Sequence, residues 1–245
     1  MYYPYVQLSI IVLFIFVSYI AFNASLMVDR NQVWVGMSKE TAHQLGTPTS
    51  SLAGWIEVLQ EIHPDIKILD ELSKDVERLE KITERFSRIG SKATLFLTDL
   101  TPILLQTIDY LKTRTSSKVS FKIDFDTDKA QIVPLNASLF EWVIENVAKN
   151  AIDAMGGSGI ITFQIKEVGK NVIIDVSDTG KGIPKSDFNK IFFAGFSTKQ
   201  RGWGVGLSLT KRIIEDFHNG KIFVKHSELG IGSCIRIILS KDDTV

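Results

Sequence analysis

The sequence predicts three consecutive parts: an N-terminal transmembrane helix, an all-α helical hairpin and an α+β sandwich domain. The first 28 residues carry no formal charge and are largely apolar. Apolar residues then recur at spacings of three and four in two stretches that a His-Pro-Asp turn separates. From about Ser91, short strand-like runs alternate with helical ones. We therefore expect boundaries at residues 1–28, 29–93 and 94–245.

The overall composition excludes some classes of function. The 245-residue chain has 28 basic and 28 acidic residues, so its formal net charge is zero, which does not favour a nucleic-acid partner. Its one cysteine, Cys234, rules out an intrachain disulfide and fits a reducing compartment. The four histidines are scattered, so the sequence contains no cluster of Cys and His that would predict a metal site.

The N-terminal segment from Tyr5 to Phe22 is apolar except for Gln7, Ser9 and Ser18. About 18 to 20 such residues can span a bilayer as a helix. A secretory signal peptide would have a basic start and a shorter apolar core of about 7–15 residues, and a buried core helix is the other alternative. We expect a single span in the inner (plasma) membrane, with the part of the chain that follows it in the cytoplasm.

Two amphipathic helices are predicted next, over residues 31–62 and 66–89, with Pro64 between them because proline cannot continue a helix. The apolar positions are Leu45, Leu52, Ile56, Leu59 and Ile62 in the first helix and Leu72, Val76, Leu79, Ile82, Phe86 and Ile89 in the second. One hairpin buries little apolar surface. The stripes therefore predict a homodimer in which two hairpins form a four-helix bundle; packing on the rest of the chain is the alternative.

The C-terminal part has the pattern of a mixed sheet with helices on one face. The expected strands lie within 93–97, 119–125, 159–166, 171–178, 221–227 and 233–239. The expected helices lie near 101–113, 137–155, 186–192 and 205–218.

The first polar motif is ENVAKNAIDAM, residues 145–155, late in a predicted helix. Asn146 and Asn150 are one helical turn apart, so their amides point the same way. Amide oxygens suit magnesium, which usually keeps several waters and adds the phosphates of a substrate. Solvated positions on a surface helix are the alternative.

The second motif is DVSDTGKGIP, residues 175–184, directly after an apolar strand. The Asp178 carboxylate can accept a hydrogen bond from an exocyclic amine such as that of adenine. Gly180 and Gly182 allow the backbone to turn sharply and to approach a flat ring closely. A simple strand-ending turn is the alternative, although it would not need so long a motif.

The third motif is RGWGVGLSLTKR, residues 201–212. Its glycines Gly202, Gly204 and Gly206 precede Leu207 at the start of a helical run, where free amides bind phosphate oxygens. The preceding segment 189–200 is rich in Phe and has the features of a mobile lid, with Lys199 placed to meet a γ-phosphate. Together the three motifs predict a site for ATP and Mg²⁺.

These motifs, behind a helical hairpin that contains a histidine, resemble the catalytic part of two-component sensor histidine kinases from about residue 31 to the end. The matches are His43 to the H box, Asn146 and Asn150 to the N box, Asp178, Gly180 and Gly182 to the G1 box, Phe192 to Phe196 to the F box, and Gly202, Gly204 and Gly206 to the G2 box. The resemblance implies a dimerising hairpin and a Bergerat-type (GHKL) ATP-binding sandwich. It also implies that Asn150 holds magnesium and that Asp178 binds the adenine amine.

His43 lies on a helical stripe of polar and small residues, apart from the leucine stripe. The members of this stripe are Gly36, Glu40, His43, Thr47, Ser50 and Gly54. His43 should therefore face solvent, and Pro48 should kink the helix beside it.

The resemblance implies an enzyme, a protein-histidine kinase. It would phosphorylate His43 from Mg-ATP and pass the phosphoryl group to an aspartate of a separate response regulator. Thr47 matches the position that orients a hydrolytic water in bifunctional members, so phosphatase activity toward the regulator fits as well. The family usually has an acidic residue directly after the histidine. Here that residue is Gln44, and Glu40 is the candidate base in its place.

The N box also departs from the common pattern of the family. Asp153 stands where a basic residue is usual and Ala154 where an aromatic is usual, and Lys199 is the candidate source of the missing charge. Two other functions stay open. A non-catalytic, nucleotide-sensing dimeric scaffold of the same fold would agree with Gln44. An ATP-driven clamp of the same superfamily would need a glutamate where this chain has Asn146.

Overall fold

The computed structural model describes residues 3–63, 65–66, 68–88, 94–198 and 204–242. The chain divides into two compact units, Met1–Lys92 and Ala93–Val245. We describe each unit by itself.

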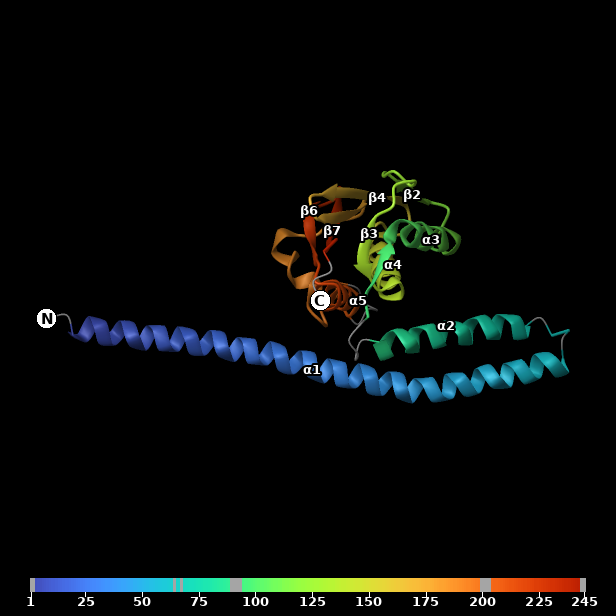
Figure 1. Cartoon of the computed structure of the whole chain (residues 1–245), viewed down its shortest axis with the longest axis horizontal. Helices are drawn as coiled ribbons and strands as arrows, with labels where there is room; N and C mark the ends of the chain where they lie inside the picture. The colour runs from blue at the N-terminus through green and yellow to red at the C-terminus, as the bar shows by residue number, and fades with distance from the viewer. Residues whose placement is uncertain (1–2, 64, 67, 89–93, 199–203, 243–245) are drawn as a thin grey trace. The chain divides into compact units, whose positions relative to one another are not determined.

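The first unit consists of two helices that lie alongside each other, α1 (Tyr3–Ile62) and α2 (Ile68–Arg88) (Figure 1). Of the predicted apolar positions, Ile56 of α1 and Val76 of α2 are buried, and Leu69 of α2, which was not among them, is buried as well. A Cβ added at Gly46 would lie 3.6 Å from the Thr83 methyl group, so a small residue fits the close approach of the helices there.

α1 continues through Pro48 as a single 60-residue helix. Pro48 has no N–H to donate to the Gln44 carbonyl. The next residue, Thr49, adds side-chain hydrogen bonds to this turn of the helix. Its hydroxyl donates to the carbonyls of Leu45 (2.8 Å) and Gly46 (2.9 Å). The kink expected at Pro48 stays a prediction.

The membrane span expected in residues 1–28 is not supported. Among the described residues, no helix contains a stretch that is both long enough and apolar enough to cross a bilayer. The described apolar side chains between Tyr5 and Tyr19 are exposed on α1.

The second unit is an α+β sandwich with a five-stranded sheet in the order β2-β4-β5-β7-β6 and a two-stranded sheet β1-β3. Strands β2 and β4 are parallel, and the other neighbours in both sheets are antiparallel. The strands are β1 (Phe96–Asp99), β2 (Val119–Ile123), β3 (Ile132–Leu135), β4 (Gly159–Val168), β5 (Asn171–Asp178), β6 (Lys221–Glu228) and β7 (Gly232–Ser240). The helices are α3 (Leu100–Arg114), α4 (Ala137–Ala154) and α5 (Gly206–Arg212).

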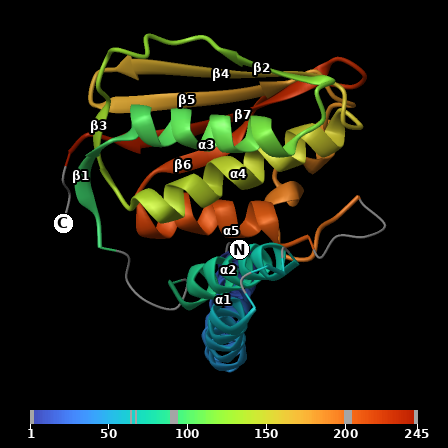
Figure 2. The ribbon, with the colours of Figure 1, turned by 90° about the vertical axis from the view of Figure 1, so that its right-hand side faces the viewer.

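Figure 2 shows the three helices on one face of the five-stranded sheet. The core lies between the two layers, because alternate residues of each strand point toward the helices. In β5, for example, Val172, Ile174 and Val176 are buried. Phe163 of β4 and Phe140 of α4 are among the largest side chains that are fully buried. The predicted α+β sandwich is therefore confirmed.

Two details of this unit differ from the sequence-based expectation. Strand β3 was not among the expected strands, and it contains Pro134, which cannot donate a backbone hydrogen bond to a sheet. It is tolerated here in a two-stranded sheet, where β3 has one partner. The helix expected near 186–192 is wrong: the segment forms two short 3₁₀ turns, Lys185–Asp187 and Lys190–Phe192, with a turn between them that does not continue a helical ladder.

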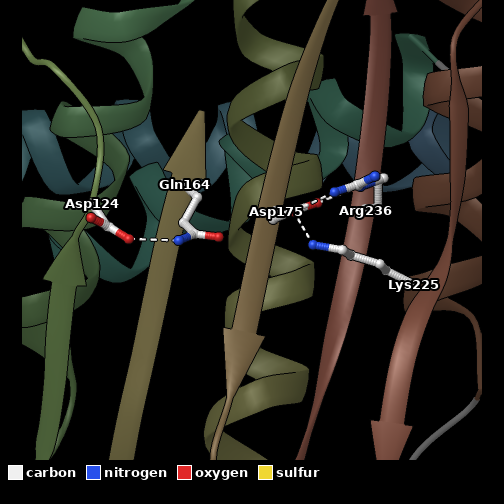
Figure 3. Close-up of polar contacts among 5 residues, drawn as sticks. All are labelled: Asp124, Gln164, Asp175, Lys225 and Arg236. Atoms are coloured by element: carbon white, nitrogen blue, oxygen red, sulfur yellow. Dashed lines mark hydrogen bonds and ion pairs between the residues drawn. The ribbon is translucent and has the colours of Figure 1, made fainter. Parts of the chain in front are cut away.

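The sheet face opposite the helices contains a buried carboxylate, Asp175, in the middle strand β5 (Figure 3). Asp175 accepts two hydrogen bonds of 2.7 Å from the Arg236 guanidinium of β7 and one of 2.8 Å from the Lys225 ammonium of β6. Burial opposes ionisation, but these donors outweigh it and lower the pKa of Asp175. The cluster therefore ties three neighbouring strands together as an ion pair with more than one donor. Beside it, Gln164 donates to Asp124.

The His218 side chain connects the N-terminus of α4 with the C-terminal end of α5. α5 continues into a π-helical turn, Ile213–Phe217, and the His218 side chain directly after this turn is buried. Its Nδ1 lies 2.7 Å from the Ile213 carbonyl, and its Nε2 accepts from the backbone N–H of Asn136, the N-cap of α4, at 3.1 Å. The ring is therefore neutral, with its proton on Nδ1. Burial lowers the pKa of His218 below its ordinary value.

The stability of the second unit should depend on pH through His218. The unfolded histidine takes up a proton near pH 6.5, whereas the folded one does so only at lower pH, because burial disfavours the charged ring and lowers the pKa of His218. The stabilisation is complete above about pH 6.5 and decreases as the pH falls below it. Thermal unfolding at pH 7.5, 6.5 and 5.5 should show this decrease in the wild type and a smaller one in His218→Gln. The exposed His226→Gln variant serves as control, and parallel curves for wild type and His218→Gln would contradict the assignment.

Candidate functional site

A cavity of about 560 Å³ lies beside the C-terminal half of α4. The other walls come from the loop after β5, the segment 187–198, the start of α5 and the turn between β6 and β7. The apolar residues of its lining include Ile183, Ile191, Phe196, Leu207 and Leu229. The polar residues include Asn146, Lys149, Asn150, Asp153, Lys181, Asp187 and Thr198. A cavity lined by both apolar side chains and charged and amide side chains suits a ligand that has a flat base and an anionic tail.

Helix α4 places two amides on the wall of the cavity, one turn apart. The Asn150 amide nitrogen donates to the Asn146 carbonyl at 2.7 Å, which holds the Asn150 side chain in place. Of the two ends of this amide, the Oδ1 oxygen is the one that can ligate a cation. The Asn146 amide nitrogen is buried and has no hydrogen-bond partner among the described residues. A buried donor without a partner costs about 1–3 kcal/mol, so this atom indicates a place for a ligand. The donor set fits a magnesium-bound phosphate group.

Asp178, at the end of β5, closes the turn that follows it. Its Oδ1 accepts from the Gly180 backbone N–H at 2.8 Å. Burial raises the pKa of Asp178, against hydrogen bonds from Gly180 and Ser233 that lower it. Asp178 and Gly180 lie next to the cavity but are not part of its lining.

The glycines of this loop allow contacts between backbones. A Cβ at Gly180 would lie 2.7 Å from the Ala154 carbonyl oxygen. Gly182 has φ +74°, and a Cβ there would lie 2.3 Å from the Glu228 carbonyl oxygen. The sequence analysis assigned these glycines to the approach of a flat ring. The structure shows that they first of all permit the loop to fit between the end of α4 and the β6–β7 turn.

The segment before α5 is closed at its base by one backbone hydrogen bond, from the Gly195 N–H to the Gly204 carbonyl at 3.0 Å. Gly204 has φ +64°, and a Cβ there would lie 2.6 Å from the Phe196 carbonyl oxygen. Phe192 is buried, whereas Phe193 is exposed. Gly204 therefore serves the closure of this loop.

Six of the residues predicted from sequence meet in the cavity: Asn146, Asn150, Gly182, Gly204, Gly206 and Leu207. Lys199 and Gly202 lie outside the described residues. Glu40, His43 and Thr47 belong to α1 of the first unit, and their side chains also lie outside the described part. Their roles stay predictions.

Sequence reasoning missed several residues of the lining. Lys149 and Lys181 could have been found, because each directly adjoins a predicted site residue in the sequence. Leu229 had no such signal, since it reaches the cavity only through the folding of the β6–β7 turn.

Comparison with known proteins shows what this site is similar to. Residues 136–243 match the family described as histidine kinase-, DNA gyrase B- and HSP90-like ATPase. The chain is similar to sporulation kinase C of Bacillus subtilis, with 27% identity over 202 residues, which cover 81% of this chain and 47% of that protein. It is also similar to the sensor histidine kinase ZraS of Salmonella typhimurium, with 31% identity over 209 residues, which cover 81% of this chain and 44% of ZraS. The chain thus spans less than half the length of these two relatives.

Solved structures show the same fold. The nucleotide-free catalytic domain of the histidine kinase ThkA is 25% identical with a TM-score of 0.54, covering 61% of this chain and 97% of that one. ThkA in complex with the response regulator TrrA gives a TM-score of 0.57 at 24% identity, covering 87% and 64%. Full-length ShkA in complex with AMPPNP gives 0.61 at 17% identity, covering 84% and 46%. The last two show likeness of fold alone.

The close approach at Gly182 yields a prediction. Gly182→Ala should destabilise the second unit and weaken nucleotide binding, because its Cβ meets the Glu228 backbone and its φ is positive. Gly157→Ala is a matched control, with φ +79° but no atom within 4 Å of the added Cβ, and should cost only about 1–2 kcal/mol. Urea unfolding and ATP titration of both variants provide the measurement. Equal effects of the two substitutions would show that the contact with Glu228 is unimportant.

Proposed function

We propose that this chain, a homologue of the sensor histidine kinases, phosphorylates its own His43 from Mg-ATP. Its residues 136–243 form an ATPase domain of the histidine kinase, DNA gyrase B and HSP90 type. The observation that carries the proposal is the pair Asn146 and Asn150 on the cavity wall, with one buried amide donor that no described residue satisfies.

The nucleotide would lie with its base against the apolar side of the cavity and its phosphates toward α4. The base would pack against Ile183, Leu207 and Leu229. The Asp178 carboxylate would accept a hydrogen bond from the exocyclic amine of the base. Asn150 Oδ1 would hold the magnesium ion, which neutralises charge on the phosphate oxygens as the γ-phosphoryl group is transferred.

In the transfer step, a neutral imidazole nitrogen of His43 attacks the γ-phosphorus in line with the leaving oxygen of ADP. A nitrogen–phosphorus bond forms, the bond to the bridging oxygen breaks, and the imidazole proton is released. Gln44 cannot accept this proton, and Glu40, one turn earlier, is the base that we propose.

The phosphoryl group would then pass to an aspartate of a separate response regulator. This step is supported by the homology to sensor histidine kinases, and ThkA, which shares the fold, has been solved with a response regulator. Thr47, four residues after His43, is the residue that we assign to dephosphorylation of the regulator.

Dimerisation would complete the helical unit. α2 covers one flank of the apolar stripe of α1, and the other flank is left exposed in the single chain. This exposed flank consists of Leu45, Leu52, Trp55, Leu59 and Ile62 of α1, together with Leu72 and Leu79 of α2. A continuous apolar flank of this kind marks an interface, and a second copy with the same flank would bury it as a four-helix bundle.

Autophosphorylation is tested with γ-labelled ATP and magnesium. The wild type should gain a label that acid removes and base does not, because a phosphohistidine is acid-labile. His43→Ala should gain none, whereas His63→Ala, in the exposed turn between the helices, should be labelled like the wild type.

Two results would count against the kinase proposal. Label on His43→Ala would place the acceptor elsewhere. Absence of label from the wild type, with ATP still bound, would favour the nucleotide-sensing scaffold.

Dimerisation is tested by changing one exposed leucine. Leu52→Glu should convert a dimer into a monomer in light scattering coupled to size-exclusion chromatography, because two carboxylates would be buried at the centre of the bundle. Ser50→Glu, exposed on the other side of α1, should leave the dimer intact. A Leu52→Glu protein with the same mass as the wild type would contradict the proposed interface.

A further inference from the structure

The proposed function does not say which cationic side chain of the cavity binds the phosphates. A nucleoside triphosphate needs positive charge beside its phosphates, and the described lining contains two lysines, Lys149 and Lys181, against two carboxylates, Asp153 and Asp187. The two lysines stand on different walls, one on α4 and one on the loop after β5.

Lys149 has the geometry of a residue held ready for an anion. It directly precedes Asn150, and its ammonium group lies 3.1 Å from the Glu145 carboxylate one turn earlier on α4. The Glu145 side chain is only 8% exposed, whereas that of Lys149 is 57% exposed and lines the cavity. An ammonium group has three donors, of which Glu145 takes one.

Lys181 lies in a different setting. Its backbone is fixed at both sides, by the N–H to the Ala154 carbonyl at 3.0 Å and by the carbonyl to the Gly230 N–H at 2.9 Å. Its ammonium group lies 3.5 Å from the hydroxyl of Thr198, another residue of the lining, and Lys181 directly precedes Gly182 and Ile183, of which Ile183 is proposed to pack against the base. Lys149, next to Asn150, is therefore the lysine on the phosphate side.

We propose that Lys149 binds the phosphates of the nucleotide and that Glu145 is a positioning residue for it. This inference rests on the proposed function and names a binding residue within the same site. The buried carboxylate limits the motion of the ammonium group, so that a charge-assisted hydrogen bond to a phosphate oxygen forms without ordering a free side chain.

The test compares ATP with adenosine, which has no phosphate. Isothermal titration of the full chain with each ligand, in magnesium, should show that Lys149→Ala weakens ATP binding by between about tenfold and a hundredfold. Adenosine binding should be unchanged. Lys149→Arg should recover most of the ATP affinity, and Glu145→Gln should lose part of it while adenosine binds normally.

Lys112→Ala is the matched control. Lys112 is also a helical lysine paired with a carboxylate, Asp109 at 2.9 Å, but it lies on α3 and is absent from the cavity lining. It should bind ATP and adenosine like the wild type. If Lys149→Ala does not fold, Lys149→Gln removes the charge with nearly the same side-chain length. This variant should also bind ATP more weakly and adenosine with unchanged affinity.

Two outcomes overturn the inference: unchanged ATP affinity in the Lys149 variants, or an equal loss of ATP and adenosine affinity, which would indicate a structural role. Failure of the proposed function is distinguishable from both. If Lys149→Ala weakens ATP binding as expected but the wild type never gains label on His43, the kinase proposal is refuted and the phosphate contact of Lys149 is supported.

Discussion

Lys181 of the loop after β5 is held by its backbone between two other elements, and the shape of the cavity depends on this contact. The Lys181 N–H donates to the last turn of α4 at Ala154, and its carbonyl accepts from Gly230 in the β6–β7 turn. Neighbouring positions tolerate no side chain, since a Cβ at Gly232 would lie 1.9 Å from the Asp178 carbonyl oxygen. The loop therefore brings one wall from α4 and another from the β6–β7 turn into fixed positions, and Leu229 becomes part of the lining.

The second unit treats its buried polar groups in two different ways. Asp175 receives three donors from two strands, and His218 uses both ring nitrogens to join α4 and the end of α5. In contrast, the amide nitrogen of Asn146 has no hydrogen-bond partner among the described residues, and the same holds for Gln131 Oε1 and Arg212 Nε. Of these three buried atoms, only the Asn146 nitrogen belongs to a residue of the cavity lining, where the proposed nucleotide would supply an acceptor.

The proposed reaction separates its two chemical components between the two compact units. His43 belongs to α1, and the cavity belongs to the sandwich. The sandwich must hold the triphosphate firmly enough to present the γ-phosphorus to a histidine of another unit. A lysine held by a buried carboxylate beside Asn150 would serve this purpose, because it would contact the phosphates from the same helix that is proposed to hold the metal.

The sequence by itself determined most helices and strands of the sandwich, with the exception of β3 and the segment 185–192, and the order of its polar motifs, because side-chain periodicity and the chemistry of Asn, Asp and Gly are local properties. The alternation in β5 and the one-turn spacing of Asn146 and Asn150 are visible without a structure. Other features depend on partners far along the chain. Pro134 is compatible with a strand only because β1 is its single partner, and Gly182 is required by the backbone of Glu228, 46 positions away in the sequence. The tertiary structure alone decided that Leu229 and Lys149 share one cavity, since no local pattern can bring a hairpin turn to the end of a helix.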